Sequence, residues 1–568
     1  VQAFSRQTPE RLIEVTSSLT PISRQNAPLA RAPPRATRTT REAKAVDRFP
    51  ARSHRTRAPN ARRGVAFDDD RRLARNSAAN ARSVMTASAH ELEGKASTGR
   101  RSMTVERRRS VDGYHRDGWN VRASALKELC NPIRRIVDEM VGLANPEKRL
   151  ISLAQGDPTV FGHLLPPKTA MDEVAGAFST SAHNGYTASA GSATARAAVA
   201  MRYSLPDRPP LRTEDVFMTV GCSEALSHSF AAMAVEGANI LLPRPGFPLY
   251  ETLCHRHGLG YKFYDLDDEN GWEVKIDDVR RLRDENTVAI VVNNPSNPCG
   301  AVFSEGHLRE ICETCHELRL PIIADEVYED VAFDEDRPFL SIAAFSGRVP
   351  VMVVSALSKR WLAPGWRIGW LVLHDYDHIL QTAGVQLAIN NLCQVSLGPP
   401  TPIQAAIPGI FKANETEWLK ATLGVLRRAS QRCVERCARV RGLTVPCEPQ
   451  GAMYVLLKMN GDAFKDANGF FTDVTFAKRL LAEESVLVLP GTCFHAPGYL
   501  RLVITVPDDE LQNAWDRIET FCERYSVERA LTDSPNELDA LSNLHISELK
   551  TNIKFVDSDE DLLKARSR

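Results

Sequence analysis

The stretch Thr287–Tyr328, TVAIVVNNPSNPCGAVFSEGHLREICETCHELRLPIIADEVY, decides the fold class of this chain. It holds two short apolar runs, TVAIVV and LPIIA, and between them a segment with helical spacing that begins after a capping serine, Ser304. Near-continuous apolar runs that alternate with helix-length segments are typical of a parallel sheet covered on both faces. The stretch therefore predicts an α/β domain.

The same alternation extends to both sides of this stretch, from about residue 170 to 415, through the runs DVFMTVG, NILLPRP, PVMVVSALSK and IGWLVLH. After it the texture changes to long helices with short strands, AMYVLLKM and LRLVITV, which predicts a smaller α+β domain. We expect the mostly parallel sheet to form a large domain and both ends of the catalytic region to build the smaller one. The predicted parts are a basic arm at 1–118, an N-terminal segment at 119–165, a large domain at 166–414, a small domain at 415–528 and an acidic tail at 529–568.

The charge of the chain is unevenly distributed. Residues 1–118 carry 25 Lys and Arg against 12 Asp and Glu, a surplus of 13 positive charges in a chain whose formal net charge is zero. This arm is rich in Arg, Ala, Ser, Thr and Pro, and such a composition buries too little apolar surface to offset the entropy of ordering. A solvated linker is the favoured interpretation, and a mitochondrial transit segment or a tail that attracts nucleic acid remain alternatives.

Polar side chains follow three of the apolar runs at the point where each run ends. Asn297, Asp325 and Lys359 occupy these positions, and ligands of such sheets bind at the carboxyl ends of the strands. Tyr328 follows in a turn that we expect to enter a helix, and Arg367 comes eight positions after Lys359, across a Pro-Gly turn. Each residue alone has an ordinary structural explanation, such as a solvent-facing lysine at a strand end. The ordered set indicates one site.

A pyridoxal phosphate cofactor needs side chains of these types. A lysine amine forms a Schiff base with its aldehyde, an acidic group keeps its pyridine nitrogen protonated, and donors hold its ring oxygen and its phosphate. The predicted roles are Lys359 as the Schiff base, Asp325 as partner of the pyridine nitrogen, Asn297 and Tyr328 as donors to the ring oxygen, and Arg367 with Ser358 as the phosphate clamp.

Ordered blocks over about residues 119 to 525 resemble the class I aminotransferases of fold type I, and within that family the chain is most similar to the tyrosine aminotransferases. The blocks are NPIRRIVDEM, GDPTVFG, NGYTASAG, PRPGFPLYETL, VNNPSNPCGAVFS, ADEVYEDVAF, SKRWLAPGWRIGW, PQGAMYVLL and PGTCFHAPGYLRLVITVP. The resemblance implies that Phe247 stacks on the pyridine ring, and that Cys222 and Ser223 bind the phosphate at a helix N-terminus. It further implies that Tyr186 reaches the phosphate of a neighbouring subunit, that Arg501 grips the substrate α-carboxylate with Asn297 nearby, and that Gly156 closes over that carboxylate.

The function that the resemblance implies is ping-pong transamination with pyridoxal 5′-phosphate. L-tyrosine, with other aromatic amino acids, gives its amino group to 2-oxoglutarate, which yields 4-hydroxyphenylpyruvate and L-glutamate, with Lys359, Asp325 and Tyr328 as the catalytic residues. Alternatives are an aminotransferase for alanine, methionine, leucine or kynurenine, or a C–S lyase on the same fold. A cofactor-sensing regulator is a further alternative, but residues 1–118 lack the periodicity of a DNA-binding module.

The expected partners are amino acids, 2-oxo acids and a second copy of the chain, in a homodimer with shared active sites. We expect no metal, nucleic acid or membrane partner. Single cysteines spread through a long chain indicate a reducing compartment, with the cytoplasm as first choice and the mitochondrial matrix as second.

Overall fold

The computed structural model describes residues 124–140 and 142–527. The arm predicted for 1–118 and the tail predicted for 529–568 lie outside the described residues, and the domain bounds inside the described part remain predictions. Within these ranges no helix is long and apolar enough to cross a membrane.

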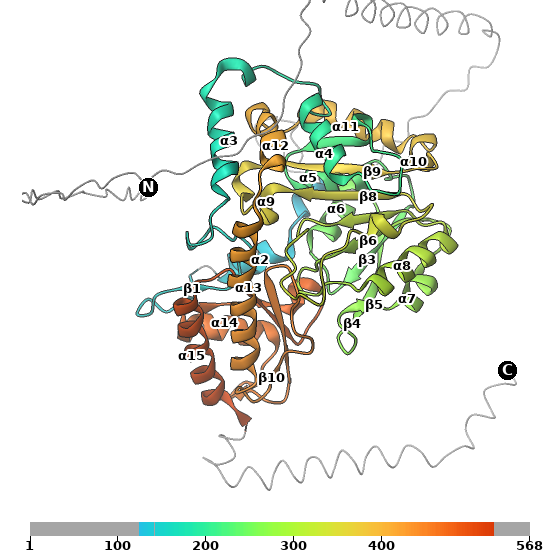
Figure 1. Cartoon of the computed structure of the whole chain (residues 1–568). Helices are drawn as coiled ribbons and strands as arrows, with labels where there is room; N and C mark the ends of the chain where they lie inside the picture. Colours follow the sequence, from blue (N-terminus) through green and yellow to red (C-terminus); the bar gives the residue numbers. More distant parts are fainter. Residues whose placement is uncertain (1–123, 141, 528–568) are drawn as a thin grey trace, which may run out of the picture. The chain divides into compact units, whose positions relative to one another are not determined.

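A mixed sheet of eight strands forms the centre of the larger part (Figure 1). In spatial order its strands are β2 (Val216–Thr219), β9 (Gly369–His374), β8 (Val351–Ala356), β7 (Ile322–Asp325), β6 (Thr287–Asn293), β3 (Asn239–Arg244), β4 (Gly260–Asp267) and β5 (Glu273–Val274). The pairs β8–β7, β7–β6, β6–β3 and β3–β4 are parallel, which confirms a mostly parallel sheet.

Two strands run against this direction. β9 is antiparallel to both β8 and β2, and β5 is antiparallel to β4. A strand buried on both faces has the same apolar pattern in either direction, so the sequence could not show that β9 is reversed. The sequence analysis also missed β4, whose side chains are mostly half-buried and whose run, GYKFYDLD, is not continuously apolar.

Helices cover both faces of the large sheet because successive strand side chains point to opposite sides. Ile322 and Ala324 of β7 face a core that also holds side chains of α4 (Ala193–Tyr203), α7 (Ile276–Leu282), α8 (Glu305–Leu318) and α12 (Thr401–Lys412). Ile323 faces the opposite core, which includes side chains of α5 (Cys222–Ala231), α6 (Leu249–His257) and α11 (Val385–Ser396). As predicted, α8 begins after Ser304, whose hydroxyl accepts a hydrogen bond from the His307 amide at 3.2 Å.

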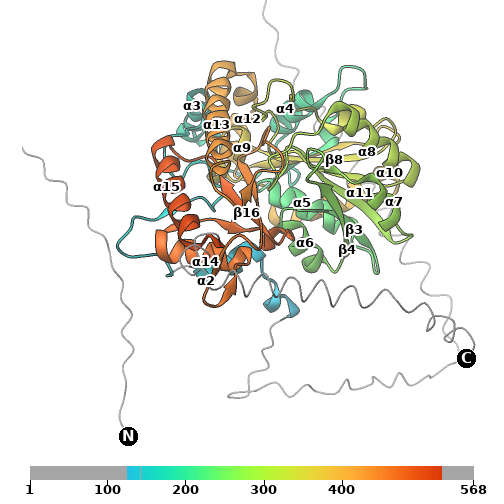
Figure 2. The ribbon, with the colours of Figure 1, turned by 90° about the horizontal axis from the view of Figure 1, so that it is seen from below.

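The smaller part contains an antiparallel sheet in the order β10 (Leu443–Thr444), β11 (Tyr454–Met459), β16 (Tyr499–Val503) and β15 (Leu489–Pro490). Side chains of α13 (Thr416–Cys437), α14 (Asp473–Glu484) and α15 (Asp508–Tyr525) share its core. Figure 2 shows these three helices and β16 in the orange and red part of the ribbon.

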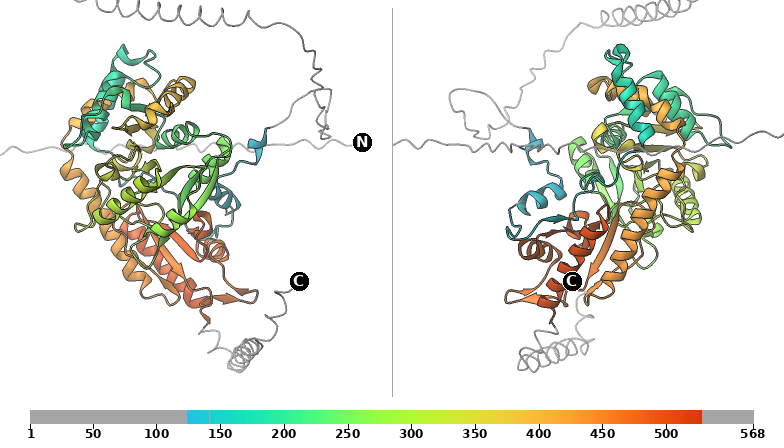
Figure 3. Two further views of the ribbon diagram at one scale, coloured as in Figure 1. Left: turned by 90° about the vertical axis from the view of Figure 1, so that its right-hand side faces the viewer. Right: turned by 60° about the vertical axis from the view of Figure 1, so that its left-hand side comes forward.

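Segments from before and after the large sheet meet in this smaller part. β1 (Ile151–Ser152) pairs in parallel with β14 (Val486–Leu487), and α2 (Pro132–Met140) contributes Ile136 and Met140 to the same core. Figure 3 shows α2, in blue, beside the orange and red C-terminal elements. The chain therefore passes through the smaller part before and after it forms the large sheet.

Candidate active site

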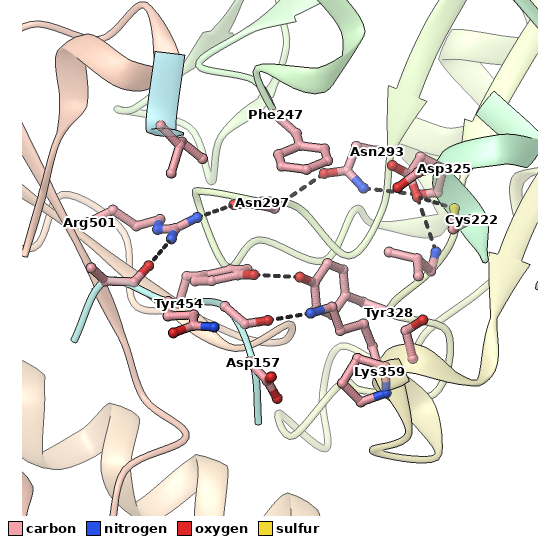
Figure 4. Close-up of a pocket in the computed structure, with 18 of the residues that line it drawn as sticks. Asp157, Cys222, Phe247, Asn293, Asn297, Asp325, Tyr328, Lys359, Tyr454 and Arg501 are labelled. Carbon is pink, nitrogen blue, oxygen red and sulfur yellow. Dashed lines mark hydrogen bonds between the residues drawn. The ribbon is translucent and has the colours of Figure 1, made fainter. Parts of the chain in front are cut away.

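A cavity of about 430 Å³ lies where the carboxyl edge of the large sheet meets the smaller part (Figure 4). Eleven of the twelve predicted site residues line it. They are Gly156, Cys222, Ser223, Phe247, Asn297, Asp325, Tyr328, Ser358, Lys359, Arg367 and Arg501.

Lys359 enters the cavity from α9 (Leu357–Arg360), a short helix that follows β8 without an intervening loop. Its side chain is half-buried, and Nζ donates a hydrogen bond to the carbonyl oxygen of Gly156. The same nitrogen lies 5.9 Å from the centre of the Tyr328 ring. The amine therefore sits inside the cavity and not in solvent at a strand end.

Asp325 is the last residue of β7 and is 3% exposed. Oδ2 accepts a hydrogen bond from the Tyr250 hydroxyl at 2.7 Å, and Oδ1 accepts from the Val327 amide at 3.3 Å and from the Cys222 thiol at 3.7 Å. Burial raises the pKa of Asp325, and these hydrogen bonds oppose the rise. All three donors are neutral, so a cation from a ligand, such as a protonated pyridine nitrogen, fits this carboxylate.

Two asparagines tie β6 and its following loop to β7. Asn293, the last residue of β6, accepts a hydrogen bond from the Asn297 amide at 2.7 Å and donates one to the Asp325 carbonyl oxygen at 2.9 Å. These bonds fix the backbone of Asn297, whose side-chain oxygen accepts a hydrogen bond from Arg501 at 3.0 Å. Asn297 therefore links the edge of the large sheet to the smaller part.

Tyr328 lies in a turn after β7, and the helix that we expected to follow this turn is absent at Val327–Asp330. Asp325, at the end of β7, and Tyr328, in the turn after it, still line the same cavity. The hydroxyl oxygens of Tyr328 and Tyr454 are 2.6 Å apart. Burial, followed by Tyr454, raises the pKa of Tyr328, so its hydroxyl stays protonated and able to donate.

Arg501 belongs to β16 and is 2% exposed. Its guanidinium donates to the Ala154 carbonyl oxygen at 2.6 Å, and its central carbon lies over the ring of Tyr454, at 4.4 Å, and over that of Phe494, at 4.7 Å. Burial lowers the pKa of Arg501, and its Nε atom has no hydrogen-bond partner among the described residues. A buried guanidinium with an unused donor fits a carboxylate ligand.

A group of donors suited to phosphate lies at the opposite end of the cavity. Cys222 and Ser223 form the first turn of α5, where free backbone N–H groups and the helix dipole favour an anion. The preceding Gly221 has φ +74°, and a Cβ atom there would come within 2.6 Å of Arg367 Nη2, so glycine keeps this corner open. Ser358, in α9, lines the same cavity.

Arg367 reaches this corner because β9 is reversed. It precedes β9, and its guanidinium donates to the carbonyl oxygens of Pro364, at 2.9 Å, and Val220, at 3.2 Å. The start of an antiparallel strand lies at the carboxyl edge of its parallel neighbours, which brings Arg367 beside the start of α5.

Tyr186 is the one predicted residue that does not line the cavity, and its side chain is 91% exposed. Its expected contact is to a second copy of the chain, so this role remains a prediction. The sequence analysis missed Asn293, Tyr250 and Tyr454. Asn293 had a signal, because it also ends a buried apolar run, whereas the two tyrosines look like ordinary core residues of a helix and a strand.

The geometry agrees with the comparisons with known proteins. The family model described as "Aminotransferase class I and II" matches residues 148–518. The chain belongs to this family. Tyrosine aminotransferase of Mus musculus is 41% identical over 408 residues, 72% of this chain and 88% of that protein.

A relative with another named substrate and a solved structure also match the chain. Nicotianamine aminotransferase 1 of Oryza sativa subsp. japonica is 34% identical over 73% of this chain and 83% of that protein. The crystal structure of tyrosine aminotransferase from Leishmania infantum superposes with a TM-score of 0.67 at 29% identity, covering 73% of this chain and all of that one. The present chain is therefore an aminotransferase with the α/β fold of fold type I. Pyridoxal 5′-phosphate is the cofactor of its family.

Proposed function

We propose that this aminotransferase moves the amino group of L-tyrosine, and of other aromatic amino acids, to 2-oxoglutarate in two half-reactions, with 4-hydroxyphenylpyruvate and L-glutamate as products. The observation that carries the proposal is the 41% identity to a tyrosine aminotransferase over 88% of its length. The cavity supports it with a buried guanidinium, Arg501, whose Nε atom has no hydrogen-bond partner among the described residues and can bind the α-carboxylate of the substrate.

The proposed roles are those that the family resemblance implies, and they are supported by the shared cavity that these residues line. When bound, pyridoxal phosphate supplies an electron-withdrawing ring that stabilises negative charge at the substrate α-carbon. Lys359 would hold the cofactor covalently, and its Nζ would move the proton at the substrate α-carbon. Asp325 keeps the pyridine nitrogen protonated, and Tyr328 with Asn297 donates to the ring oxygen.

The remaining contacts position the two ends of the cofactor and the substrate. Phe247 stacks on the ring, while Cys222, Ser223, Ser358 and Arg367 bind the phosphate. Gly156 closes over the substrate carboxylate that Arg501 holds. These residues act by orientation and charge, and the covalent chemistry belongs to Lys359 and the cofactor.

The substrate end of the cavity carries both apolar and cationic side chains. Ile133 and Val137 of α2 and Leu487 of β14 line the wall and suit an aromatic ring. Arg134, an exposed residue of α2, lines the same cavity and supplies a positive charge for the second carboxylate of 2-oxoglutarate. This combination supports an aromatic donor and a dicarboxylate acceptor.

A nicotianamine donor is the second candidate, because a nicotianamine aminotransferase is 34% identical to this chain. The deciding experiment measures kcat/KM for a panel of donors with 2-oxoglutarate, including tyrosine, phenylalanine, nicotianamine, alanine, methionine, leucine and kynurenine. Tyrosine and phenylalanine are expected among the best donors. A clear preference for any other donor overturns the tyrosine proposal and leaves the family assignment intact.

A homodimer with shared active sites is part of the proposal. Tyr186 is almost fully exposed, and large apolar side chains of α3 (Lys168–Ser179) are exposed as well, namely Met171 at 47% and Phe178 at 59%. A second copy would bury this surface and let Tyr186 reach the phosphate of the partner's cofactor. Light scattering should give twice the mass of the chain, and a monomer that is fully active refutes the shared site.

The proposed compartment is the cytoplasm, with the mitochondrial matrix as the alternative. All twelve cysteines are unpaired, which suits a reducing compartment. Fractionation with antibodies against the native protein tests this placement, and recovery from a secretory compartment contradicts it.

A further inference from the structure

Tyr454 contacts three parts of the cavity at once. It is the first residue of β11 and is 2% exposed. Its hydroxyl lies 2.6 Å from that of Tyr328, its ring faces the Arg501 guanidinium at 4.4 Å, and a Cβ atom at Gly156 would collide with its hydroxyl (Figure 4). Tyr454 thus lies between the arginine proposed to hold the substrate and the tyrosine proposed to hold the cofactor.

The Tyr454 hydroxyl can strengthen Tyr328 as a donor. When Tyr454 donates to the oxygen of Tyr328, the proton of Tyr328 is free for an acceptor in the cavity. In such a chain of hydroxyls each hydrogen bond polarises the next. This step rests on the proposed role of Tyr328 as donor to the cofactor ring oxygen.

The Tyr454 ring acts on the other side of the residue. The buried Arg501 guanidinium lies over this ring and also over that of Phe494, at 4.7 Å. A desolvated cation over an aromatic face is held more strongly than one in water. The two rings therefore help to hold the guanidinium in place, while its Nε has no hydrogen-bond partner among the described residues.

We propose that Tyr454 is a positioning residue that joins the carboxylate grip to the cofactor: its hydroxyl makes Tyr328 a stronger donor to the ring oxygen, and its ring holds Arg501 in the orientation that receives the substrate carboxylate. The hydroxyl and the ring have separate tasks, so two substitutions separate them.

The hydroxyl is tested by Tyr454→Phe in the holoenzyme, with the visible absorbance of the bound cofactor followed as a function of pH. A hydrogen-bond donor to the ring oxygen of the cofactor stabilises the deprotonated form of the cofactor, in which no proton compensates the negative charge on that oxygen. A weaker donor therefore moves the midpoint of the titration to higher pH. The expected shift is about half to one pH unit, the size of one hydrogen bond. Tyr264→Phe is the matched control, because Tyr264 is a buried tyrosine that donates to the Val291 carbonyl oxygen at 2.6 Å outside the cavity.

The ring is tested by the affinity of the holoenzyme for unreactive carboxylates, 3-phenylpropionate and glutarate, measured by calorimetry. Tyr454→Phe keeps the ring and is expected to stay within about twofold of wild type. Tyr454→Leu removes it and is expected to weaken both ligands about 3- to 30-fold, the range for a cation–π contact. Tyr454→Met serves as a second variant without a ring in case the leucine variant does not fold.

The outcomes separate this inference from the function on which it rests. If Tyr328→Phe leaves the titration midpoint unchanged, the proposed role of Tyr328 fails, and the hydroxyl part of the inference falls with it. If Tyr328→Phe shifts the midpoint and Tyr454→Phe does not, the role of Tyr454 alone is wrong. In the double variant Tyr328→Phe/Tyr454→Phe, the second substitution is expected to add no further shift of the titration midpoint. A midpoint shift equal to the sum of the two single shifts contradicts the chain of hydroxyls. If the variants without a ring at position 454 bind both carboxylates with unchanged affinity, the proposed role of the Tyr454 ring in holding Arg501 is wrong.

Discussion

Tyr250→Phe tests how the structure controls the charge of Asp325. The Tyr250 hydroxyl donates to Asp325 Oδ2 at 2.7 Å, and both side chains are almost fully buried. The substitution removes one hydroxyl and keeps the ring that lies 5.8 Å from Phe247. Any change therefore reports the hydrogen bond to the carboxylate.

The expected cost depends on pH. A hydrogen bond to a charged group contributes about 1.5–3 kcal/mol and one to a neutral group about 0.5–1.5 kcal/mol. Burial raises the pKa of Asp325, so the folded apoprotein keeps a proton that the unfolded chain has already lost, and stability falls as pH rises through this window. Loss of the Tyr250 hydroxyl raises the pKa of Asp325 further and deepens that fall. The variant should lose about 1.5–3 kcal/mol at pH values where wild-type Asp325 is ionised and about 0.5–1.5 kcal/mol where it is protonated.

The assay is urea unfolding of the apoprotein at acidic and at mildly alkaline pH, in wild type, Tyr250→Phe and Tyr264→Phe. The control loses a hydrogen bond to a backbone carbonyl, so its cost of about 0.5–1.5 kcal/mol should not change with pH. A loss in Tyr250→Phe that is equal at both pH values refutes the reasoning. The same variant should bind pyridoxal phosphate more weakly, because the Asp325 carboxylate, which we propose pairs with the pyridine nitrogen, is less stabilised as an anion.

Three further substitutions probe other parts of the cavity. Lys359→Ala should abolish both transamination and the visible absorbance of covalently bound cofactor, and wild-type turnover in this variant contradicts the role of Lys359. Arg501→Lys keeps the charge but loses the planar fork, so KM for the amino donor should rise at least about tenfold while cofactor affinity is retained. Gly156→Ala should lower activity because its Cβ collides with the Tyr454 hydroxyl, and Tyr454→Phe should restore part of the loss; no restoration means that another contact causes the defect.

Much of the large sheet was predictable because its strands are buried on both faces. Six predicted apolar runs correspond to β2, β3, β6, β7, β8 and β9, and the polar residues predicted after three of them, Asn297, Asp325 and Lys359, line one cavity. β4 was missed because its side chains are mostly half-buried, and the direction of β9 was hidden because apolar runs carry no direction. Asn297, Asp325 and Lys359 could be chosen as site residues because an amide, a carboxylate and an amine that follow neighbouring buried strands match the groups that pyridoxal phosphate needs.

The sequence by itself determined six strands of the large sheet, several residues that follow these strands at their carboxyl ends and, through its ordered blocks, the family. Those features are local, because burial and turn chemistry leave a mark within a few neighbouring residues. Only the tertiary structure decided which side chains support the site. Tyr250 meets Asp325 across 75 positions of the chain, and Tyr454 meets Tyr328 across 126. Contacts at such separations exist only once the two parts have packed together, and a buried tyrosine in a helix or strand gives no sign beforehand of which group its hydroxyl will reach.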